Sequence, residues 1–348
     1  RIYILFWVGP FEVEPEIRID PNLCGNCVLT YDHRYLDKSD GVIIHLTDAF
    51  KDKISNPKRR KSHHMFAFYS TKSPYVISMF RGIRFEDMNY YFNNYNLQED
   101  SSIYLPFVEL NGHNGVFSGE TEFSYGEIII QNIIAKKQKT QHMALWISGN
   151  CAIPNKDAVI RKHLIAAMEI RLTVDKYGKC FNRTAPERSE YFTFAAKYNF
   201  YLAFENADHC QDYITDKLLW SNSYEAGLVP VVWGPIRADI KAIASKDSFV
   251  FYKDFQNIAV VKYLKYLDGN PLEYRKYFNW RLQQLTPAEY VMIEHGPQYQ
   301  RDVGMCKMCR LLWKKRRYNN VTSVVHSIHA LNEPYECVQM QFMSFLHV

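Results

Sequence analysis

Short apolar runs bounded by polar or breaker residues recur along this chain and set its expected elements. The first run, Ile2–Val8, is continuous and ends at a Gly-Pro pair, a pattern typical of a buried strand. Further strand-like runs follow at Gly41–Leu46, Met65–Tyr69 and Ile103–Val108, with polar segments between them. From these runs we predict an irregular α/β lobe over residues 1–140.

The second half of the chain alternates strands and helices more regularly. A basic polar segment, Lys136–Gln141, precedes it and marks the expected boundary. The predicted strands are Met143–Ser148, Leu172–Tyr177, Phe200–Phe204, Val229–Trp233 and Ser248–Tyr252, and the predicted helices are Asn155–Leu172, Ile214–Ala226, Ile258–Leu267 and Pro271–Arg281. This alternation indicates βαβ units and a parallel sheet. We predict a second α/β lobe over residues 141–300 and a tail over residues 301–348 that packs back on the first lobe.

Length and composition agree with two globular lobes. The 348 residues exceed the size of about 250 to 300 residues at which single cores stop growing. Hydrophobic residues make up 47% of the chain, which is too many for a disordered protein. The net charge of +5 favours anionic ligands, but the basic runs are short and lack interleaved aromatic residues. We therefore expect no nucleic-acid partner.

No apolar run reaches the roughly 18 residues that a membrane-spanning helix needs. The chain also begins at Arg1 rather than at Met. Two interpretations stay open. In one, the chain meets a membrane only through an N-terminal anchor that is missing from it; in the other, it is a processed soluble protein.

Eight cysteines include two Cys-x-x-Cys pairs, Cys24 with Cys27 and Cys306 with Cys309. Four such thiolates suit a tetrahedral zinc site, but zinc sites usually bring their pairs closer in sequence. The alternative is two disulfides that tie the tail to the first lobe, as an oxidising compartment permits. We favour the disulfides and expect no metal site. Closing so long a loop would stabilise the fold by about 4 kcal/mol in the chain-entropy model.

Of the remaining cysteines, Cys151 and Cys180 flank one predicted helix. We pair these two and leave Cys210 with Cys337, although four cysteines allow other connectivities.

Two Asn-x-Thr triplets, at Asn182 and Asn320, stand in polar surroundings and predict N-linked glycans on a lumenal or secreted chain. Arg183 lies inside the first triplet and would reach a bound phosphate, whereas a glycan on Asn182 would stand beside it. We expect at most one of these two roles to hold.

The segment Phe200–Pro235 carries the clearest chemistry, with a buried strand, a polar acidic loop, a helix and a second buried strand. Its loop, Glu205–Lys217, lies where the carboxyl end of a parallel strand meets a helix, the usual ligand crevice of open α/β sheets. Lys217 there would neutralise a diphosphate, while short carboxylates and an amide would orient sugar hydroxyls. The alternative is that Asp216 caps the helix and Lys217 is solvated.

Blocks spread over most of the chain match one family in order. They are Trp7–Phe11, Leu29–Thr30 after Cys27, Asp40–His45, Ser73–Pro74, Trp146–Cys151, Val174–Cys180, Phe200–Pro235, Tyr277–Arg281 and Cys306–Cys309. In these blocks the chain resembles the alpha-1,3-fucosyltransferases. The resemblance implies an α/β fold of glycosyltransferase-B type, with two Rossmann-like lobes and a cleft between them.

The resemblance also implies an activity and a location. The family transfers L-fucose with inversion from GDP-fucose to a GlcNAc residue of a glycoprotein or glycolipid glycan, either a Lewis-type LacNAc or the N-glycan core. Its members are type II membrane proteins of the Golgi. No Asp-x-Asp metal motif occurs in this chain, so we expect a donor site that requires no cofactor and uses cationic side chains in place of a divalent ion.

Carried over residue by residue, the family's donor motif falls on Glu205, Asn206, Tyr213, Thr215, Asp216 and Lys217. Neighbouring strand ends are expected to add Ser148, Asn150, Tyr177 and Gly178 to the same cleft. Where the family has an arginine after the strand-end cysteine, this chain has Asp157. We expect Arg161, one helical turn later on the same face, to replace that arginine at the donor.

The position of the family's catalytic base is occupied by a different residue type. The family has a glutamate before Ser-Pro, and the aligned residue here is Lys72, which is protonated near neutral pH and does not act as a carboxylate. Other candidate bases in the first lobe are Glu86, Asp87, Glu99 and His64. Two hypotheses follow: an active fucosyltransferase with its base elsewhere, or a catalytically impaired relative that binds donor or glycan. A bacterial-type nucleotide-sugar enzyme fits the cysteines poorly.

Overall fold

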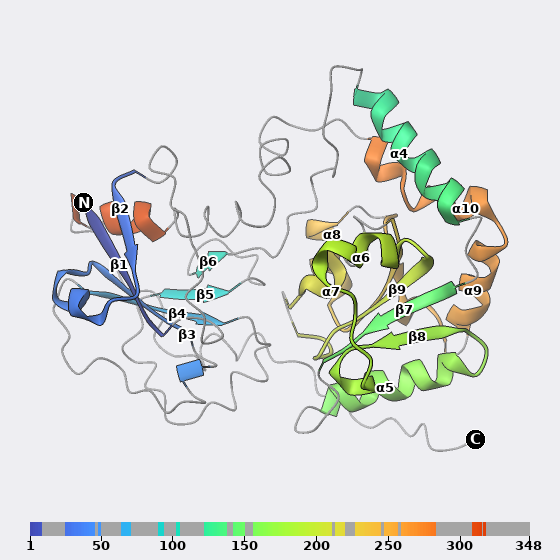
Figure 1. The fold of residues 1–348 in the computed structure, drawn as a ribbon, viewed down its shortest axis with the longest axis horizontal. Coiled ribbons are helices and arrows are strands. Elements are labelled where there is room, and N and C mark those ends of the chain that lie inside the picture. Colours follow the sequence, from blue (N-terminus) through green and yellow to red (C-terminus); the bar gives the residue numbers. More distant parts are fainter. Residues whose placement is uncertain are drawn as a thin grey trace. The chain divides into compact units, whose positions relative to one another are not determined.

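The structure is a computed structural model of the chain (Figure 1). It describes residues 1–8, 25–45, 48–49, 64–70, 90–93, 102–104, 122–137, 142–149, 156–210, 213–219, 227–244, 247–256, 259–282, 308–314 and 316–317. Contacts divide the chain into two units. The first comprises Arg1–Pro106, Cys210–Tyr213 and Gly296–Val348, and the second comprises Phe107–His209 and Ile214–His295.

A parallel sheet forms most of the described part of the first unit. Its strands are β1 (Ile2–Val8), β2 (Cys27–Thr30), β3 (Gly41–His45), β4 (Met65–Ser70), β5 (Tyr90–Asn93) and β6 (Ser102–Tyr104), in the order β2-β1-β3-β4-β5-β6. Every neighbouring pair is parallel. The apolar runs predict β1, β3, β4 and β6. They do not predict β2, which is short, or β5, whose Tyr- and Asn-rich sequence lacks a strand-like period.

Residues near the end of the chain complete the core of this first sheet. Alternate residues of β1, from Ile2 to Phe6, are buried in one cluster with Met308 and Leu312, which belong to the helical residues 308–314. A Cβ atom on Gly41 would lie 2.6 Å from the end of the Met308 side chain, so a larger residue there would have to displace that side chain.

The second unit contains a five-stranded parallel sheet in its described part. Its strands are β7 (His142–Ile147), β8 (Val174–Tyr177), β9 (Tyr198–Phe204), β10 (Val229–Trp233) and β11 (Val250–Phe251), in the order β11-β10-β9-β7-β8. All of them lie on predicted apolar runs, so the predicted parallel α/β arrangement is confirmed for this unit.

Helices surround this second sheet. Those described are α4 (Glu122–Lys137), α5 (Lys156–Glu169), α6 (Arg188–Ala195), α7 (Asp216–Leu219), α8 (Arg237–Ile243), α9 (Ala259–Asp268) and α10 (Pro271–Lys276), with 3-10 turns η4 (Lys179–Phe181), η5 (Tyr252–Asp254) and η6 (Asn279–Leu282). The sequence predicts α5, α7, α9 and α10. It does not predict α6 or α8, because both are too short to show a helical period clearly.

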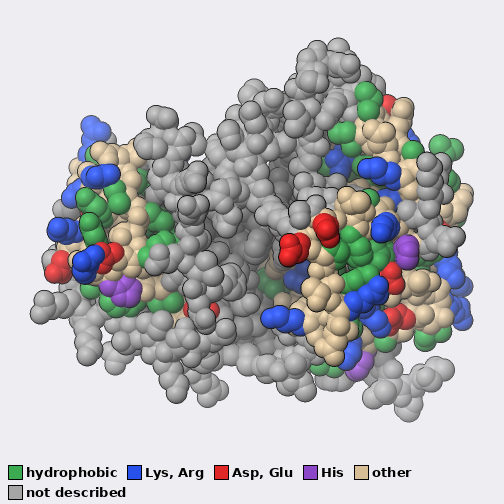
Figure 2. All heavy atoms as spheres, viewed as in Figure 1, with side chains coloured by type: hydrophobic (Ala, Val, Ile, Leu, Met, Phe, Trp, Pro, Cys, Tyr) green, Lys and Arg blue, Asp and Glu red, His purple; other side chains and the backbone are tan. Residues whose placement is uncertain are grey.

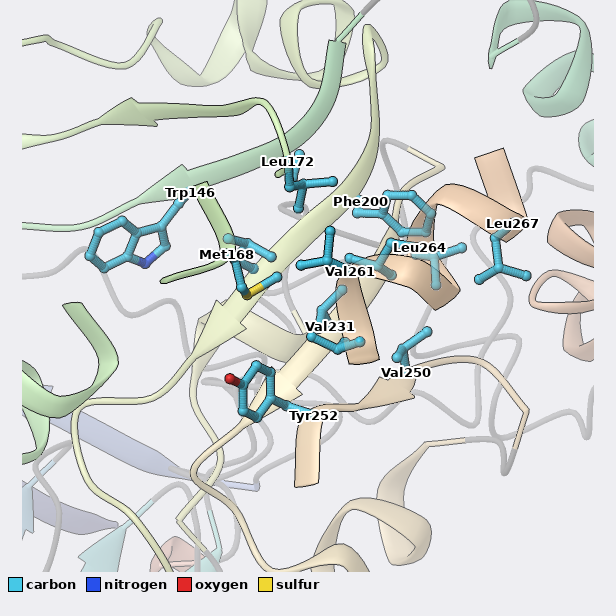
Figure 3. Close-up of a cluster of buried hydrophobic side chains, with 14 of the residues drawn as sticks. Trp146, Met168, Leu172, Phe200, Val231, Val250, Tyr252, Val261, Leu264 and Leu267 are labelled. Atoms are coloured by element: carbon cyan, nitrogen blue, oxygen red, sulfur yellow. The ribbon is translucent and has the colours of Figure 1, made fainter. Parts of the chain in front are cut away.

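A hydrophobic core joins the second sheet to α9. β9 is the central strand and is buried along its whole length. The buried residues of α9 run from Val260 to Leu267 with the spacing of one helical face. In Figure 3, Leu264 of α9 lies in one cluster with Phe200 of β9 and Val231 of β10. Each such side chain contributes about 1.5 to 3 kcal/mol on burial, so this core holds the strand ends in fixed positions.

The predicted domain boundary at residue 140 is corrected by the packing of α4. Ile130 of this helix is fully buried in the same core as the strands of the second sheet. Glu127 pairs with Arg275 of α10, and that guanidinium holds the pKa of the Glu127 carboxyl below its ordinary value. The two helices lie beside each other in Figure 1. The basic segment Lys136–Gln141 begins in the last turn of α4, whereas the second unit begins before that helix, at Phe107.

α4 ends on a buried lysine that holds the start of β9. The ammonium of Lys137 donates to the Ala196 carbonyl at 2.8 Å and to the Tyr198 carbonyl. Burial lowers the pKa of Lys137 to about 7, and repulsion from Lys136 adds to that effect. The contact lies at the amino end of β9, away from the polar loops described below.

Candidate functional site

Parallel strands bring polar residues from several loops to one edge of the second sheet. Because neighbouring strands are parallel, their carboxyl ends share that edge, which is where open α/β sheets bind ligands. Ser148 follows β7, Gly178 follows β8, Glu205 follows β9, Gly234 follows β10 and the turn η5 follows β11. We call this the carboxyl edge of the second sheet.

Glu205, Thr215 and Lys217 form a hydrogen-bonded cluster at this edge. The backbone N–H and the hydroxyl of Thr215 donate to Glu205 Oε1 at 2.8 and 2.7 Å. Lys217 Nζ lies 2.9 Å from Thr215 Oγ1 and 3.2 Å from Glu205 Oε2. Glu205 is fully buried, whereas 17% of the Lys217 side chain is exposed. The buried carboxylate therefore fixes the direction of an ammonium group that can meet an anion.

Thr215, rather than Asp216, caps α7. Asp216 is the first residue of the helix, and the Thr215 hydroxyl accepts from the Lys217 backbone N–H at 3.4 Å. Lys217 itself pairs with Glu205. The alternative interpretation of this loop, with Asp216 as the cap and Lys217 only solvated, is therefore wrong.

Arg161 lies beneath the carboxyl edge and links two strand ends. Its side chain is buried, with 1% of the residue exposed. Nη1 donates to the Phe204 carbonyl at the end of β9, and Nη2 donates to Ser148 Oγ after β7, both at 2.9 Å. The structure thus places Arg161 among the predicted donor residues, but with both terminal nitrogens already donating to the protein.

Gly178 allows the ends of β7 and β8 to approach closely. The Ser148 N–H donates to the Tyr177 carbonyl at 2.9 Å. Gly178 has φ +105°, and a Cβ atom there would lie 2.3 Å from the Ser148 carbonyl oxygen. No other residue type fits this conformation without displacing the backbone, so Gly178 fixes where the loop after β8 leaves the sheet.

The loop after β8 turns back on itself and stacks an arginine on a tyrosine. The Gly178 N–H donates to the Arg183 carbonyl at 2.7 Å, and Asn182, between them, adopts the left-handed conformation with φ 50°. The guanidinium carbon of Arg183 lies 3.9 Å from the centre of the Tyr177 ring. Asn182 is exposed, as a glycosylated asparagine must be.

A second polar cluster at this edge is not predicted from the sequence. Lys253 in η5 donates to the buried carboxylate of Asp208, and its ammonium lies 2.7 Å from His209 Nδ1. The His209 N–H donates to the Gly234 carbonyl at 2.7 Å. A Cβ atom on Gly234 would lie 2.7 Å from Glu205 Cβ, so this glycine sits between the two clusters. The available signal was the Asp-His pair in the same loop as Glu205.

In the first unit, His45 and Asp48 form a buried pair at the carboxyl end of β3. His45 Nδ1 and Asp48 Oδ2 are 2.7 Å apart, and the side chains are 0% and 3% exposed. Sequence reasoning missed this pair, although a buried strand that ends in histidine was a signal. His64 precedes β4, so it stands at the amino end of that strand, whereas Lys72 comes after the carboxyl end in the sequence.

On the face seen in Figure 2, charge is spread over the described residues rather than gathered in one band. Lys and Arg side chains alternate there with acidic and apolar ones on the described residues of both units. The ion pairs of Lys217 and Lys253 at the carboxyl edge are therefore better evidence for an anionic ligand than the net charge of the chain is.

Comparison with known proteins decides the family. Residues 135–330 match the C-terminal part of glycosyltransferase family 10 (fucosyltransferase), and residues 1–108 match the fucosyltransferase N-terminal domain. The chain belongs to the fucosyltransferase family. A 4-galactosyl-N-acetylglucosaminide 3-alpha-L-fucosyltransferase of Gorilla gorilla gorilla is 30% identical over 322 residues, which cover 90% of this chain and 80% of that protein. A 3-galactosyl-N-acetylglucosaminide 4-alpha-L-fucosyltransferase of Pongo pygmaeus is 28% identical over 330 residues, which cover 93% of this chain and 79% of that protein.

Solved structures share the fold of this fucosyltransferase. An alpha1,3-fucosyltransferase with GDP-fucose matches 93% of this chain and 92% of its own, with a TM-score of 0.57 and 17% identity. One with GDP matches 92% and 91%, at the same TM-score and identity. The expected α/β fold of glycosyltransferase-B type, with two Rossmann-like parallel sheets, is confirmed.

The described cysteines of this family member are oxidised. Cys27 and Cys309 form a disulfide across a sequence separation of 282 residues, with their Cα atoms 6.3 Å apart. Cys180 and Cys210 are disulfide-bonded as well, and no cysteine in the described part of the chain is free. Disulfides are thus confirmed at these positions, and the zinc alternative is wrong for Cys27 and Cys309. The pairs Cys151–Cys180 and Cys210–Cys337 stay predictions.

Several predicted residues of this fucosyltransferase are not covered by the structure. Lys72, Asn150, Asn320, Cys24, Cys151, Cys306, Cys337, Glu86, Asp87 and Glu99 lie outside the described residues. For Asp216, only the backbone is described. Asn206 is half-buried directly after Glu205, whereas Tyr213 is buried and groups with the first unit. Their roles at the donor stay predictions.

Metal and membrane features were sought in the same described ranges. They hold no group of three or more His, Cys, Asp or Glu side chains placed to bind a metal ion. Among the helices that the structure describes, none combines the length and the apolar character needed to cross a membrane.

Proposed function

We propose that this member of the family is an alpha-1,3-fucosyltransferase, which transfers L-fucose with inversion from GDP-fucose to a GlcNAc residue of a glycoprotein or glycolipid glycan. The observation that carries the proposal is the Glu205–Thr215–Lys217 cluster at the carboxyl edge of the second sheet. The names of the relatives, which act on galactosyl-N-acetylglucosaminides, favour a Lewis-type LacNAc acceptor over the N-glycan core.

The donor side of the reaction follows from this cluster. When the bond between C1 of fucose and the phosphate oxygen breaks, its electron pair leaves with GDP and the charge on the diphosphate rises. The Lys217 ammonium neutralises that charge, and its pairing with Glu205 and Thr215 holds it in one direction before the donor arrives. Asn206 supplies an amide for ribose or sugar hydroxyls. We propose that no divalent metal is required, so EDTA should leave the transfer rate unchanged.

The acceptor side needs a base that takes the proton of the attacking hydroxyl. Lys72 stands at the position of the family's glutamate and is protonated near neutral pH. The second candidate function is therefore a catalytically impaired relative that binds GDP-fucose or glycan without transfer. Glu86, Asp87, Glu99 and His64 are the candidate bases for the active form.

We propose the Golgi lumen as the place of action, on a type II membrane protein. Support comes from the family and from the oxidised cysteines. Expression with a cleavable tag in a secretory pathway, followed by glycopeptide mapping at Asn320, tests this part of the proposal.

The deciding experiment combines binding and transfer. Calorimetry with GDP is followed by GDP-fucose transfer and hydrolysis assays on a glycan array, with the unmodified protein and with Lys72→Glu. Transfer by the unmodified protein removes the impaired-relative hypothesis. GDP binding without transfer, together with transfer by Lys72→Glu, establishes it. No GDP binding at all rules out both.

A further inference from the structure

The cationic side chains at the carboxyl edge of the second sheet differ in how they are paired. Lys217 pairs with the buried carboxylate of Glu205, and Lys253 pairs with that of Asp208. Arg183, in the loop after β8, is exposed and forms no ion pair with any carboxylate in the described part of the chain. Its charge is therefore not neutralised within these ranges.

Two independent contacts fix the position of Arg183. Its carbonyl accepts from the Gly178 N–H at 2.7 Å, and the left-handed turn at Asn182 closes the loop. Its guanidinium stacks on the Tyr177 ring at 3.9 Å, and the Phe194 ring packs against the edge of Tyr177 at 4.9 Å. A stacked guanidinium keeps its N–H groups in the plane, where they can bind a phosphate in bidentate fashion. The side chain is thus organised before any ligand is present.

The other arginine of this region is less available. Arg161, which the sequence places at the donor, is 1% exposed, and its two terminal nitrogens donate to Phe204 and Ser148. Meeting a diphosphate would require it to give up those bonds. The described loops leave Arg183 as the arginine that can bind an anion without rearrangement.

We propose that Arg183 binds the diphosphate of the nucleotide-sugar donor, with the Tyr177 ring holding its guanidinium in place. In the sheet, β7 alone separates β8 from β9, so the loops that carry Arg183 and Lys217 start roughly 10 Å apart. Two long cationic side chains can close that distance over one diphosphate. The inference rests on the proposed function, because it takes GDP-fucose as the donor.

The test compares GDP with GMP by calorimetry, because only GDP has the second phosphate. Arg183→Ala should raise the Kd for GDP about tenfold or more, as the loss of a charge-assisted hydrogen bond does, and should change the Kd for GMP less. Arg183→Lys should recover only part of the affinity, because an ammonium lacks the bidentate fork. Lys179→Ala is the matched control, since it removes an exposed cation from the same loop that no described ring holds; it should leave the Kd for GDP within about twofold.

Several results would overturn the inference. An unchanged Kd for GDP in Arg183→Ala does so, and so does an equal loss for GDP and GMP or an equal effect of Lys179→Ala. A glycan on Asn182 would stand beside the bound diphosphate, so an occupied Asn182 in the active protein also overturns it. If Arg183→Ala does not fold, the Arg183→Lys comparison decides. Fucosyl transfer by the unmodified protein alongside any of these results leaves the proposed function standing, whereas absence of GDP binding by the unmodified protein removes both.

Discussion

The two parallel sheets of this fucosyltransferase carry different chemistry at their carboxyl ends. In the second unit, that edge holds Lys217 and Lys253, each on a buried carboxylate, and the exposed Arg183. In the first unit, the described strand ends hold the buried His45–Asp48 pair and the stacked rings of Trp7 and His33, whose centres are 3.9 Å apart.

The difference matches two kinds of ligand. A diphosphate needs oriented cations, whereas a neutral glycan is recognised by hydrogen bonds and by the faces of aromatic rings. Under the proposed function, one architecture has thus been adapted to two ligands by the side chains at its strand ends rather than by a change of fold.

The largest effect is expected from Lys217→Met. Loss of an oriented cation that stabilises the leaving diphosphate should lower kcat/KM for GDP-fucose about 10²- to 10³-fold. Steady-state kinetics with saturating acceptor measures it. Lys262→Met, an exposed lysine of α9, is the control and should leave kcat/KM unchanged. Equal kinetics of the two variants would mean that the charged edge of the second sheet is not the donor site.

Gly178→Ala should weaken the fold at the same edge. The new Cβ would lie 2.3 Å from the Ser148 carbonyl, at a φ of +105° that alanine rarely adopts. We expect a loss of about 3 kcal/mol in the free energy of unfolding, measured by urea denaturation. The matched control is Gly149→Ala, where a Cβ would meet nothing within 4 Å. Similar losses for both variants would contradict the close approach of β7 and β8.

In the first unit, Asp48→Asn should reduce stability without touching the donor. Removing the charge that faces His45 Nδ1 at 2.7 Å should cost about 1 to 3 kcal/mol, because both groups are buried. The Kd for GDP should stay at its original value, which calorimetry checks. A weaker GDP affinity in this variant would show that the two sheet edges do not have separate ligands.

The last prediction concerns Lys137 and depends on pH. Burial lowers the pKa of Lys137 to about 7 in the folded protein, while the unfolded chain keeps a value near 10.5. Between these values the unfolded state binds more protons, so stability should rise with pH, by about 1.4 kcal/mol per pH unit at most. Lys137→Met should remove this rise. Urea denaturation of both proteins across that window tests it, and parallel curves would refute the lowered pKa.

Much of the second unit was accessible from the sequence because its signals are local. Each of its strands is a short apolar run, and Glu205, Thr215 and Lys217 lie within one loop, so a pattern along the chain already brings them together. The family resemblance then identified GDP-fucose as the expected ligand of this loop. It did not reveal the internal bonds of Arg161, because these depend on strand ends that are far apart in sequence.

The features that the sequence did not predict depend on contacts between distant segments. Asp208 and Lys253 meet only because β9, β10 and β11 are adjacent in the sheet. α4 contains a run of isoleucines in which Ile128 is exposed while Ile130 is fully buried, and no pattern within the helix says which unit covers the buried one. Lys72 shows a different limit. The family resemblance identifies the residue at the position of the base, but it does not say which other residue takes the proton.

The packing of Met308 and Leu312 against β1 has a consequence for the way this chain is made. β1 leaves the ribosome long before the residues that cover it, and the Cys27–Cys309 disulfide joins the same two segments. The second unit has its residues available by His295, before that cover has been synthesised. The first unit therefore finishes folding only after the second has all of its residues, and until then one face of its apolar sheet lacks the side chains that cover it.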